Sequence, residues 1–278
     1  EPSRAVVHLQ DMSDPIILSD RAVLAISGED RHSFLNTLLS ADVAEVEGAA
    51  RFAALLSPQG KLLADILCLT EADRVLIDYP THSDFAKRLR MYKLRAAVTL
   101  DVLDDWSVGV SLDSRTAADN PQAAFADPRA KTLGHRIFAP ALVGSRDRTA
   151  YDRARIAAVV PEGPTDLEPN KALLLENGFE RLGGVDFRKG CFVGQEVTAR
   201  MKYRNLGKKR LMAIRCDGAL ETGEAIMAGE RTAGTVLTAT NGEALALIRH
   251  EFADKPLTIS GQNAHITADP DADAKPLA

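Results

Sequence analysis

Apolar and polar positions alternate in a way that predicts strands and helices in the first hundred residues. Residues 22–26 form a continuous apolar run that is typical of a buried strand. Ser27 and Asp30 have the spacing of a helix capping box, and Phe34, Leu35, Leu38 and Leu39 follow at helical intervals. The pattern therefore predicts a strand followed by an amphipathic helix.

The next segment predicts a hairpin and a second helix. Residues 53–56 and 62–69 are apolar runs on either side of the turn Pro58-Gln59-Gly60, and residues 75–79 continue as the next strand. Thr81 and Asp84 repeat the capping signal before a helix that carries Phe85, Leu89 and Tyr92. This helix is basic along Lys87, Arg88, Arg90, Lys93 and Arg95, a pattern that more often marks a solvated face than a ligand site.

Later segments predict further strands and a small barrel. Residues 98–103 and 108–112 look like strands, residues 116–130 like a loop or linker, and residues 151–160 like a helix that ends near Pro161. From residue 209, short apolar runs are separated by glycines, which predicts a small antiparallel barrel. The acidic residues from Asp269 predict a disordered tail.

Composition narrows the function classes. The 278 residues are 45% apolar and 26% charged, which is typical of a globular protein of two or three modest domains. A net charge of -5 argues against a general nucleic-acid coat, although residues 188–210 hold eight Lys or Arg and a single acidic residue. No apolar run approaches the ~20 residues of a membrane span. Cys68, Cys191 and Cys216 are odd in number and far apart, which predicts neither a disulfide framework nor a zinc knuckle and indicates a reducing compartment.

One segment has a composition that suggests chemistry, namely Lys189-Gly190-Cys191-Phe192-Val193-Gly194-Gln195-Glu196. Two glycines flank a cysteine in a cationic setting, where a thiol stays accessible. A helix that starts at Gly194 would pair Glu196 with Arg200 and point its positive end toward Cys191. That helix end, with Arg188 and Lys189, would favour the thiolate.

The alternative is that Cys191 is a small buried residue, which is the commoner fate of a lone cysteine. For Cys68, within an apolar strand, and Cys216, at the end of a barrel strand, we expect only this structural role.

The motif Lys-Gly-Cys-x-x-Gly-Gln-Glu resembles the signature of the YgfZ family, which is related to mitochondrial iron–sulfur assembly factors and more distantly to the glycine-cleavage T-protein. Residues 23–43, the Pro58-Gln59-Gly60-Lys61 turn and Tyr92-Lys93-Leu94-Arg95 are also similar, and the resemblance covers about residues 18–266. Phe192 departs from the usual Tyr, and Gly178 stands where many members have Asn.

The resemblance implies an α+β, T-protein-like three-part cloverleaf around a folate channel, with a C-terminal antiparallel β-barrel. It implies a discontinuous first domain of residues 1–50 and 118–204, a second α+β domain of residues 51–117, a barrel of residues 205–268 and a disordered tail of residues 269–278.

The resemblance also implies site residues. Cys191 would be the functional thiolate and a shared iron–sulfur ligand, with Lys189 beside it. A carboxylate can accept two adjacent pterin donors, and Leu175-Glu176-Asn177-Gly178 resembles the T-protein element that does so. Without the resemblance, we would predict that Glu176 is a solvated surface residue. The remaining residues of the implied tetrahydrofolate site are Asn177, Asp65, Arg95, Gly190, Gly194, Gln195, Glu196, Arg200 and Lys202. Asp65 lies near the T-protein's catalytic aspartate, and the cations would meet the anionic folate tail.

The resulting hypothesis is a tetrahydrofolate-binding accessory factor for iron–sulfur cluster assembly or repair. Any cluster would be shared with a carrier or client protein, and the resemblance suggests an A-type iron–sulfur carrier. The alternative is a folate-dependent aminomethyltransferase or another one-carbon transferase. A third reading, an RNA-binding module, is weaker because the basic stretch holds only two aromatic residues, Phe192 and Tyr203. We expect a monomer in the cytoplasm, without membrane or nucleic-acid partners.

Overall fold

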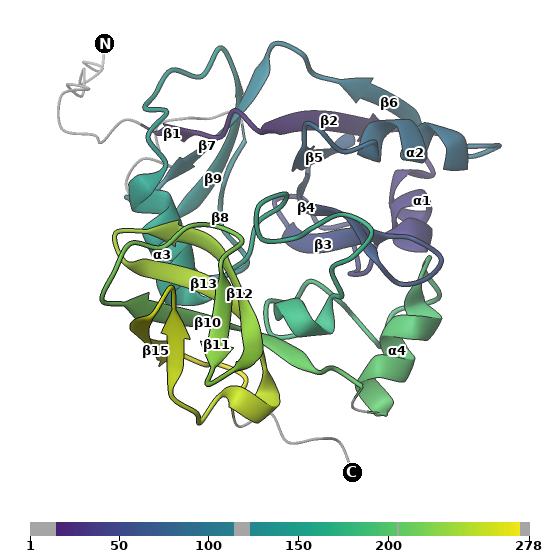
Figure 1. Ribbon diagram of the computed structural model, residues 1–278. Helices are drawn as coiled ribbons and strands as arrows, with labels where there is room; N and C mark the ends of the chain where they lie inside the picture. The colour runs from purple at the N-terminus through teal and green to yellow at the C-terminus, as the bar shows by residue number, and fades with distance from the viewer. Residues whose placement is uncertain (1–14, 114–122, 205, 273–278) are drawn as a thin grey trace.

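The computed structural model describes residues 15–113, 123–204 and 206–272, which form two antiparallel sheets and a closed barrel with helices around them (Figure 1). The fold class is the α+β class that we predicted. None of the described helices is long and apolar enough to cross a membrane.

The first sheet has five strands in the order β3-β4-β5-β2-β6. Their bounds are β2 Arg21–Ser27, β3 Ala50–Leu56, β4 Leu62–Thr70, β5 Arg74–Pro80 and β6 Thr99–Val102. The predicted hairpin is confirmed, since β3 pairs with β4 across the turn at residues 57–61. β4 is buried along its whole length, because alternate side chains belong to the apolar cores on the two faces of the sheet.

Two helices, α1 (Arg31–Leu38) and α2 (Phe85–Tyr92), cover one face of this sheet. The predicted capping boxes are wrong. The residues that precede these helices make no side-chain cap bond, and Asp30 instead accepts the amide of Ala97 at 2.7 Å. Gly28, with φ of 108°, allows this approach, since a Cβ there would lie 2.1 Å from the carbonyl oxygen of Ala97.

The second sheet packs against the other face of the first. Its strands run in the order β1-β7-β9-β8, with bounds Ile16–Ile17, Trp106–Ser111, His135–Pro140 and Ala124–Ala126. Apolar side chains of both sheets, such as Phe52 and Phe138, form one shared core with Tyr151 of α3 (Thr149–Ala158). Strands β1, β8 and β9 did not emerge from the sequence. Residues 114–122, part of the predicted loop, lie outside the described residues.

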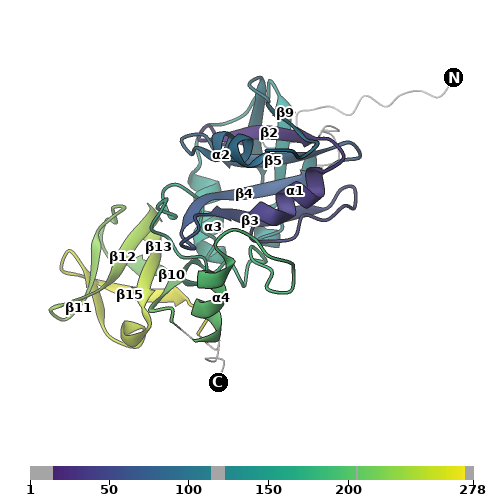
Figure 2. The same ribbon diagram turned by 90° about the vertical axis from the view of Figure 1, so that its right-hand side faces the viewer.

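The C-terminal barrel is confirmed. It closes in the order β10-β13-β12-β11-β14-β15. The strands are Lys209–Cys216, Ala225–Ala228, Arg231–Thr240, Glu243–Arg249, Leu257–Ile259 and Gln262–Ala268, numbered β10 to β15. Figure 2 shows the barrel beside the two sheets rather than stacked on them. Ile156 of α3 packs on Leu211 and Leu245 of the barrel, so α3 links the two parts.

The long segment between α3 and the barrel contains little regular structure and positions the site. It passes the hairpin end, where Leu62 exchanges backbone hydrogen bonds with Asn170 and Ala172, and it contains the short 3-10 helix η4 (Leu175–Asn177). It then leads into helix α4 (Gln195–Tyr203).

The domain boundaries that we predicted stay a prediction. The structure places β2 and α1, which we assigned to the first domain, on the same sheet as the strands of the second. Asp269, the first residue of the predicted tail, forms an ion pair with Arg210 at 2.5 Å, whereas residues 273–278 lie outside the described part.

Candidate functional site

The loop that precedes α4 carries Cys191 and is anchored by Lys189. The Nζ atom of Lys189 donates to the carbonyl oxygens of Leu39, 2.7 Å away, and Ala41, 3.1 Å away, where α1 ends. It also lies 5.4 Å from the ring centroid of Phe192. Both carbonyls belong to the segment that follows α1, and a carbonyl oxygen is a strong acceptor for an ammonium group. Lys189 therefore fastens the cysteine loop to the end of α1.

Burial lowers the pKa of the Lys189 ammonium from 10.5 to about 8, although the carboxylates of Asp42 and Asp186 oppose the shift. A neutral amine still offers two N–H donors, which match the two carbonyl oxygens. The anchor can therefore persist in either protonation state.

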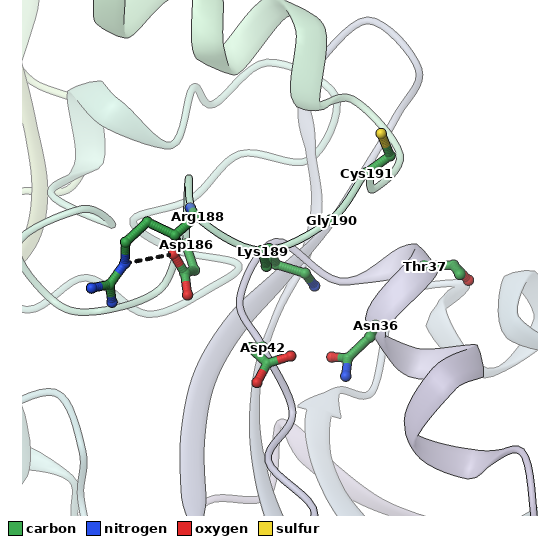
Figure 3. A pocket seen from close by; sticks show the side chains of 8 residues that line it. All are labelled: Asn36, Thr37, Asp42, Asp186, Arg188, Lys189, Gly190 and Cys191. Carbon is green, nitrogen blue, oxygen red and sulfur yellow. Dashed lines mark hydrogen bonds and ion pairs between the residues drawn. The ribbon is translucent and has the colours of Figure 1, made fainter.

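Cys191 is exposed, whereas Cys68 and Cys216 are buried in the cores of the first sheet and the barrel. Burial raises the pKa of the Cys68 thiol to about 12, which suppresses its reactivity. The predicted exposure of Cys191 is thus confirmed. The surroundings of the sulfur differ from the cationic setting that we predicted. Figure 3 shows the sulfur pointing away from Lys189 and Arg188, and the Nε atom of Arg188 lies 3.5 Å from Asp186.

The start of α4 is fixed by glycines. Gly194 holds the N-cap position with φ of 81°, and a Cβ there would lie 2.6 Å from the carbonyl oxygen of Ser57. A Cβ at Gly60 would lie 2.9 Å from Val197, so the hairpin turn packs directly on α4. Gly190 has open space around it. Half-buried Gln195 begins the helix, and Glu196 pairs with Arg200 at 3.0 Å, as predicted.

Two adjoining clefts lie beside this loop. The first, of about 730 Å³, is lined by Asn36, Thr37, Asp42, Asp186, Arg188, Lys189, Gly190 and Cys191 (Figure 3). The second, of about 520 Å³, shares Asp42, Asp186 and Arg188 with it and extends past Arg51, Phe52, Glu180, Phe187 and Lys202. Both volumes are in the range of small-molecule sites.

The second cleft combines aromatic, cationic and anionic groups. The ammonium of Lys202 lies 4.2 Å from the ring centroid of Phe187 and forms an ion pair with Glu180. Phe52 is stacked on Phe179 in the wall. The cleft can therefore bind a ligand that has an aromatic ring, hydrogen-bond donors and a negative charge.

Glu176 lies in η4 and is half-buried. Its Oε1 accepts the backbone amides of Lys208 at 3.0 Å and Lys209 at 3.2 Å. The predicted pterin acceptor thus already holds two donors, at the start of barrel strand β10. Asn177 is 1% exposed and donates to the carbonyl of Leu173 at 2.9 Å.

Asp65 does not face an open channel. It is 1% exposed, and its Oδ2 lies 3.0 Å from Nη1 of Arg21. A Cβ at Gly163 would lie 2.5 Å from its Oδ1, so the chain closes over this carboxylate. Arg95 is exposed in the segment after α2 and lines neither cleft. Of the predicted residues, the structure brings Lys189, Gly190 and Cys191 to the first cleft and Lys202 to the second, while Glu176, Asp65 and Arg95 lie elsewhere.

A buried ionic network joins Asp65 to the rest of the molecule. Arg21 contacts Asp78 at 2.5 Å, and Arg136 bridges Asp78 at 3.1 Å and Glu162 at 2.9 Å. Burial alone would raise the pKa of Glu162, but the guanidinium groups of Arg136 and Arg129 hold it well below its ordinary value. Sequence reasoning missed this network, since isolated Arg and Glu residues give no sign of burial.

The chain is 30% identical over 292 positions to the mitochondrial iron–sulfur cluster assembly factor IBA57 of Mus musculus, covering 90% of this chain and 82% of that protein. It is 33% identical over 258 positions to the Homo sapiens protein of the same name, covering 80% and 70%. This chain belongs to the IBA57 family. A mitochondrial IBA57 homolog of Pyricularia oryzae is 30% identical over 219 positions, and the chain spans 55% of that longer relative.

Two further comparisons concern the barrel and the fold. Residues 208–273 match the family of the CAF17 C-terminal beta-barrel domain. The fold is similar to the glycine cleavage system aminomethyltransferase T of Bartonella henselae, with a TM-score of 0.76 over 93% of this chain and 86% of that one. At 13% identity, this likeness shows the fold alone. It confirms the predicted T-protein-like architecture.

The predicted cytoplasmic location is wrong by these comparisons. The IBA57 relatives of mouse, human and Pyricularia oryzae are all mitochondrial proteins. Three unpaired cysteines indicate a reducing compartment but not which one, so the sequence pattern could not separate the two locations.

Proposed function

We propose that the protein assists iron–sulfur cluster assembly by offering the Cys191 thiol to a cluster that a carrier protein holds. The observation that carries this proposal is that the anchored loop exposes Cys191, whereas the other two cysteines are buried. Membership of the IBA57 family and the YgfZ-like motif around Cys191 support it.

The number of available ligands requires a partner. A cluster takes about four cysteine ligands. Among the described residues, no group of three or more His, Cys, Asp or Glu side chains could hold a metal ion. Cys191 therefore supplies one ligand, and the carrier supplies the others. As the sulfur bonds to iron, the thiol proton passes to solvent. The roles of this chain are to expose the sulfur and to hold its loop, through Lys189 and Gly194.

We place tetrahydrofolate in the second cleft. The carboxylate of Glu180, held in place by its ion pair with Lys202, suits the pterin donors, the ring of Phe187 suits a planar ligand, and Arg51 suits the anionic tail. Asp65 does not fit this site, because it is closed in an ion pair with Arg21. Glu176 keeps a place in the proposal only through Oε2, since both amide bonds end on Oε1.

The aminomethyltransferase alternative rests on the fold. It requires a carboxylate that reaches the bound one-carbon unit, and Asp65 was the predicted one. Because Asp65 is 1% exposed and paired with Arg21, the site favours the accessory role over the transferase role.

An anaerobic transfer experiment tests the role of Cys191. The wild-type chain is mixed with a purified A-type carrier that holds a [2Fe–2S] cluster, and the complex is followed by visible absorption and native mass spectrometry. We expect a cluster-containing complex for the wild type and for Cys216→Ala, and its loss in Cys191→Ser. A complex of undiminished cluster content with Cys191→Ser would refute the proposal.

Calorimetric titration with tetrahydrofolate tests the cleft. Glu180→Gln and Lys202→Met should each weaken binding about tenfold, corresponding to about 1.4 kcal/mol. Glu230→Gln, an exposed barrel residue, serves as the control. If only Glu176→Ala weakens binding, the ligand lies at η4 instead.

A further inference from the structure

A second surface, distant in sequence from Cys191, exposes apolar side chains at the end of α2. Phe85, Ala86 and Leu89 bury one face of this helix. At its C-terminal end, Met91 is 69% exposed, Tyr92 38% and Leu94 88%. We call Met91, Tyr92 and Leu94, with the cations around them, the α2 ridge.

The cations of the α2 ridge are Lys87, Arg88, Arg90, Lys93 and Arg95. Within the described part of the chain, Arg88 is the only one of them in an ion pair, with Asp84 at 2.6 Å. The chain as a whole carries a net charge of -5, so the ridge is a positive patch on an acidic protein. A complementary surface would be acidic around an apolar depression.

The backbone holds the most exposed apolar residue of the ridge in a costly conformation. Leu94 has φ of 41°, in the left-handed region that favours glycine. Nothing in the core requires this leucine, because its side chain is 88% exposed. A strained backbone that presents an apolar side chain to solvent indicates a contact surface.

We propose that the α2 ridge is a docking surface for the carrier protein, through an acidic rim around an apolar depression on that carrier. This inference rests on the proposed function. Met, Tyr and Arg are enriched where proteins contact one another, which favours a protein over a lipid surface or RNA. Figure 2 shows α2, α1 and α4 on the same side of the molecule. A ridge built on an eight-residue helix is too small for a stable interface alone, so it adds to the contact at the cysteine loop.

Binding of the purified A-type carrier, measured by isothermal titration calorimetry at low and moderate salt, tests the ridge. Met91→Gln/Leu94→Gln and Arg90→Glu should each raise Kd at least tenfold, and the charge reversal should also flatten the salt dependence. Val143→Gln, at an 84% exposed apolar residue, and Arg153→Glu, on the exposed side of α3, are matched controls that should keep the wild-type Kd.

Leu94→Gly separates binding from folding. Glycine accepts a positive φ, so the variant should melt at the wild-type temperature or above it, yet bind the carrier more weakly. A wild-type Kd in this variant and in the double variant would refute the α2 ridge as a docking surface. It would not affect the proposed role of Cys191. Absence of carrier binding by the wild-type chain would overturn both proposals. Ridge-dependent binding to phosphatidylserine vesicles or to single-stranded RNA, with carrier binding unaffected, would also overturn the ridge as a protein surface.

Discussion

The ammonium of Lys189 is half-buried against two carbonyl oxygens. Its titration should therefore be visible in the pH dependence of the protein's stability. Its pKa is about 8 in the folded chain, compared with 10.5 ordinarily. Between these values the unfolded chain holds a proton that the folded chain has released, so stability rises with pH. Below pH 8 the folded state carries the full cost of burying the charge.

We therefore predict that the stability difference between wild type and Lys189→Met shifts in favour of wild type as pH rises from 7 to 10. Thermal melting across that range measures it. Lys171→Met removes an exposed lysine and should show no such trend. A difference that stays constant with pH would mean that Lys189 keeps its charge throughout.

Exposure predicts the order in which the cysteines react. Cys191 should be alkylated first by iodoacetamide, because Cys68 and Cys216 are buried and the pKa of the Cys68 thiol is about 12. Peptide mass spectrometry identifies the labelled residue, and urea-unfolded protein, in which all three should react, is the control. Labelling of Cys216 before Cys191 would contradict the placement of the loop.

At the scale of elements, Glu176 joins η4 to the first strand of the barrel. Glu176→Ala removes an acceptor of two amide bonds and should lower the free energy of unfolding by about 1–3 kcal/mol, the scale of bonds to a charged group. Urea denaturation measures this change, and Glu230→Ala provides an exposed control in the barrel. An unchanged midpoint would show that water replaces the carboxylate without cost.

The elements that sequence reasoning predicted are those in which apolar periodicity determines structure. The buried β4, the β3–β4 turn and the glycine-separated barrel strands all follow from apolar runs and turn residues. The capping predictions failed because Asp30 found a tertiary partner in Ala97, which local spacing cannot reveal. Strands β1 and β8 have only two and three residues, too few to show a period.

The candidate site was predictable only where composition was unusual. Glycines around Cys191 correctly indicated an exposed loop. The roles of Lys189, Glu176 and Asp65 depended on contacts with residues between 32 and 150 positions away, so their partners could not be inferred from neighbouring residues. For Asp65, the resemblance suggested a channel carboxylate, whereas Arg21 neutralises it in the interior.

At the scale of the whole molecule, one buried network connects the two sheets and leads toward the barrel. Glu162 accepts from Arg136 of β9 at 2.9 Å and from Tyr151 of α3 at 2.7 Å. Its backbone amide donates to Asp166 at 2.9 Å, and Asp166 also accepts the amide of Thr238 in β12 at 2.8 Å. A substitution at Glu162 should therefore destabilise the two sheets and the barrel together.

Glu162→Gln should lower the free energy of unfolding by about 3–5 kcal/mol at pH 7, because it leaves buried guanidinium groups without their shared counter-charge.

The pKa of Glu162 is held below its ordinary 4.5, so its contribution is present above that pH and fades as pH falls toward the folded-state pKa. The difference between wild type and Glu162→Gln, measured by urea denaturation from pH 7 to pH 3, should therefore shrink on acidification. Tyr151→Phe removes no charge but loses the hydroxyl that donates to Glu162 and accepts from Arg129, and it should cost about 1–3 kcal/mol. Glu168→Gln, at an exposed ion pair with Lys171, should cost at most about 1 kcal/mol. If Glu162→Gln is as mild as Glu168→Gln, the arginines must be neutralised by other carboxylates, and the network would not depend on Glu162.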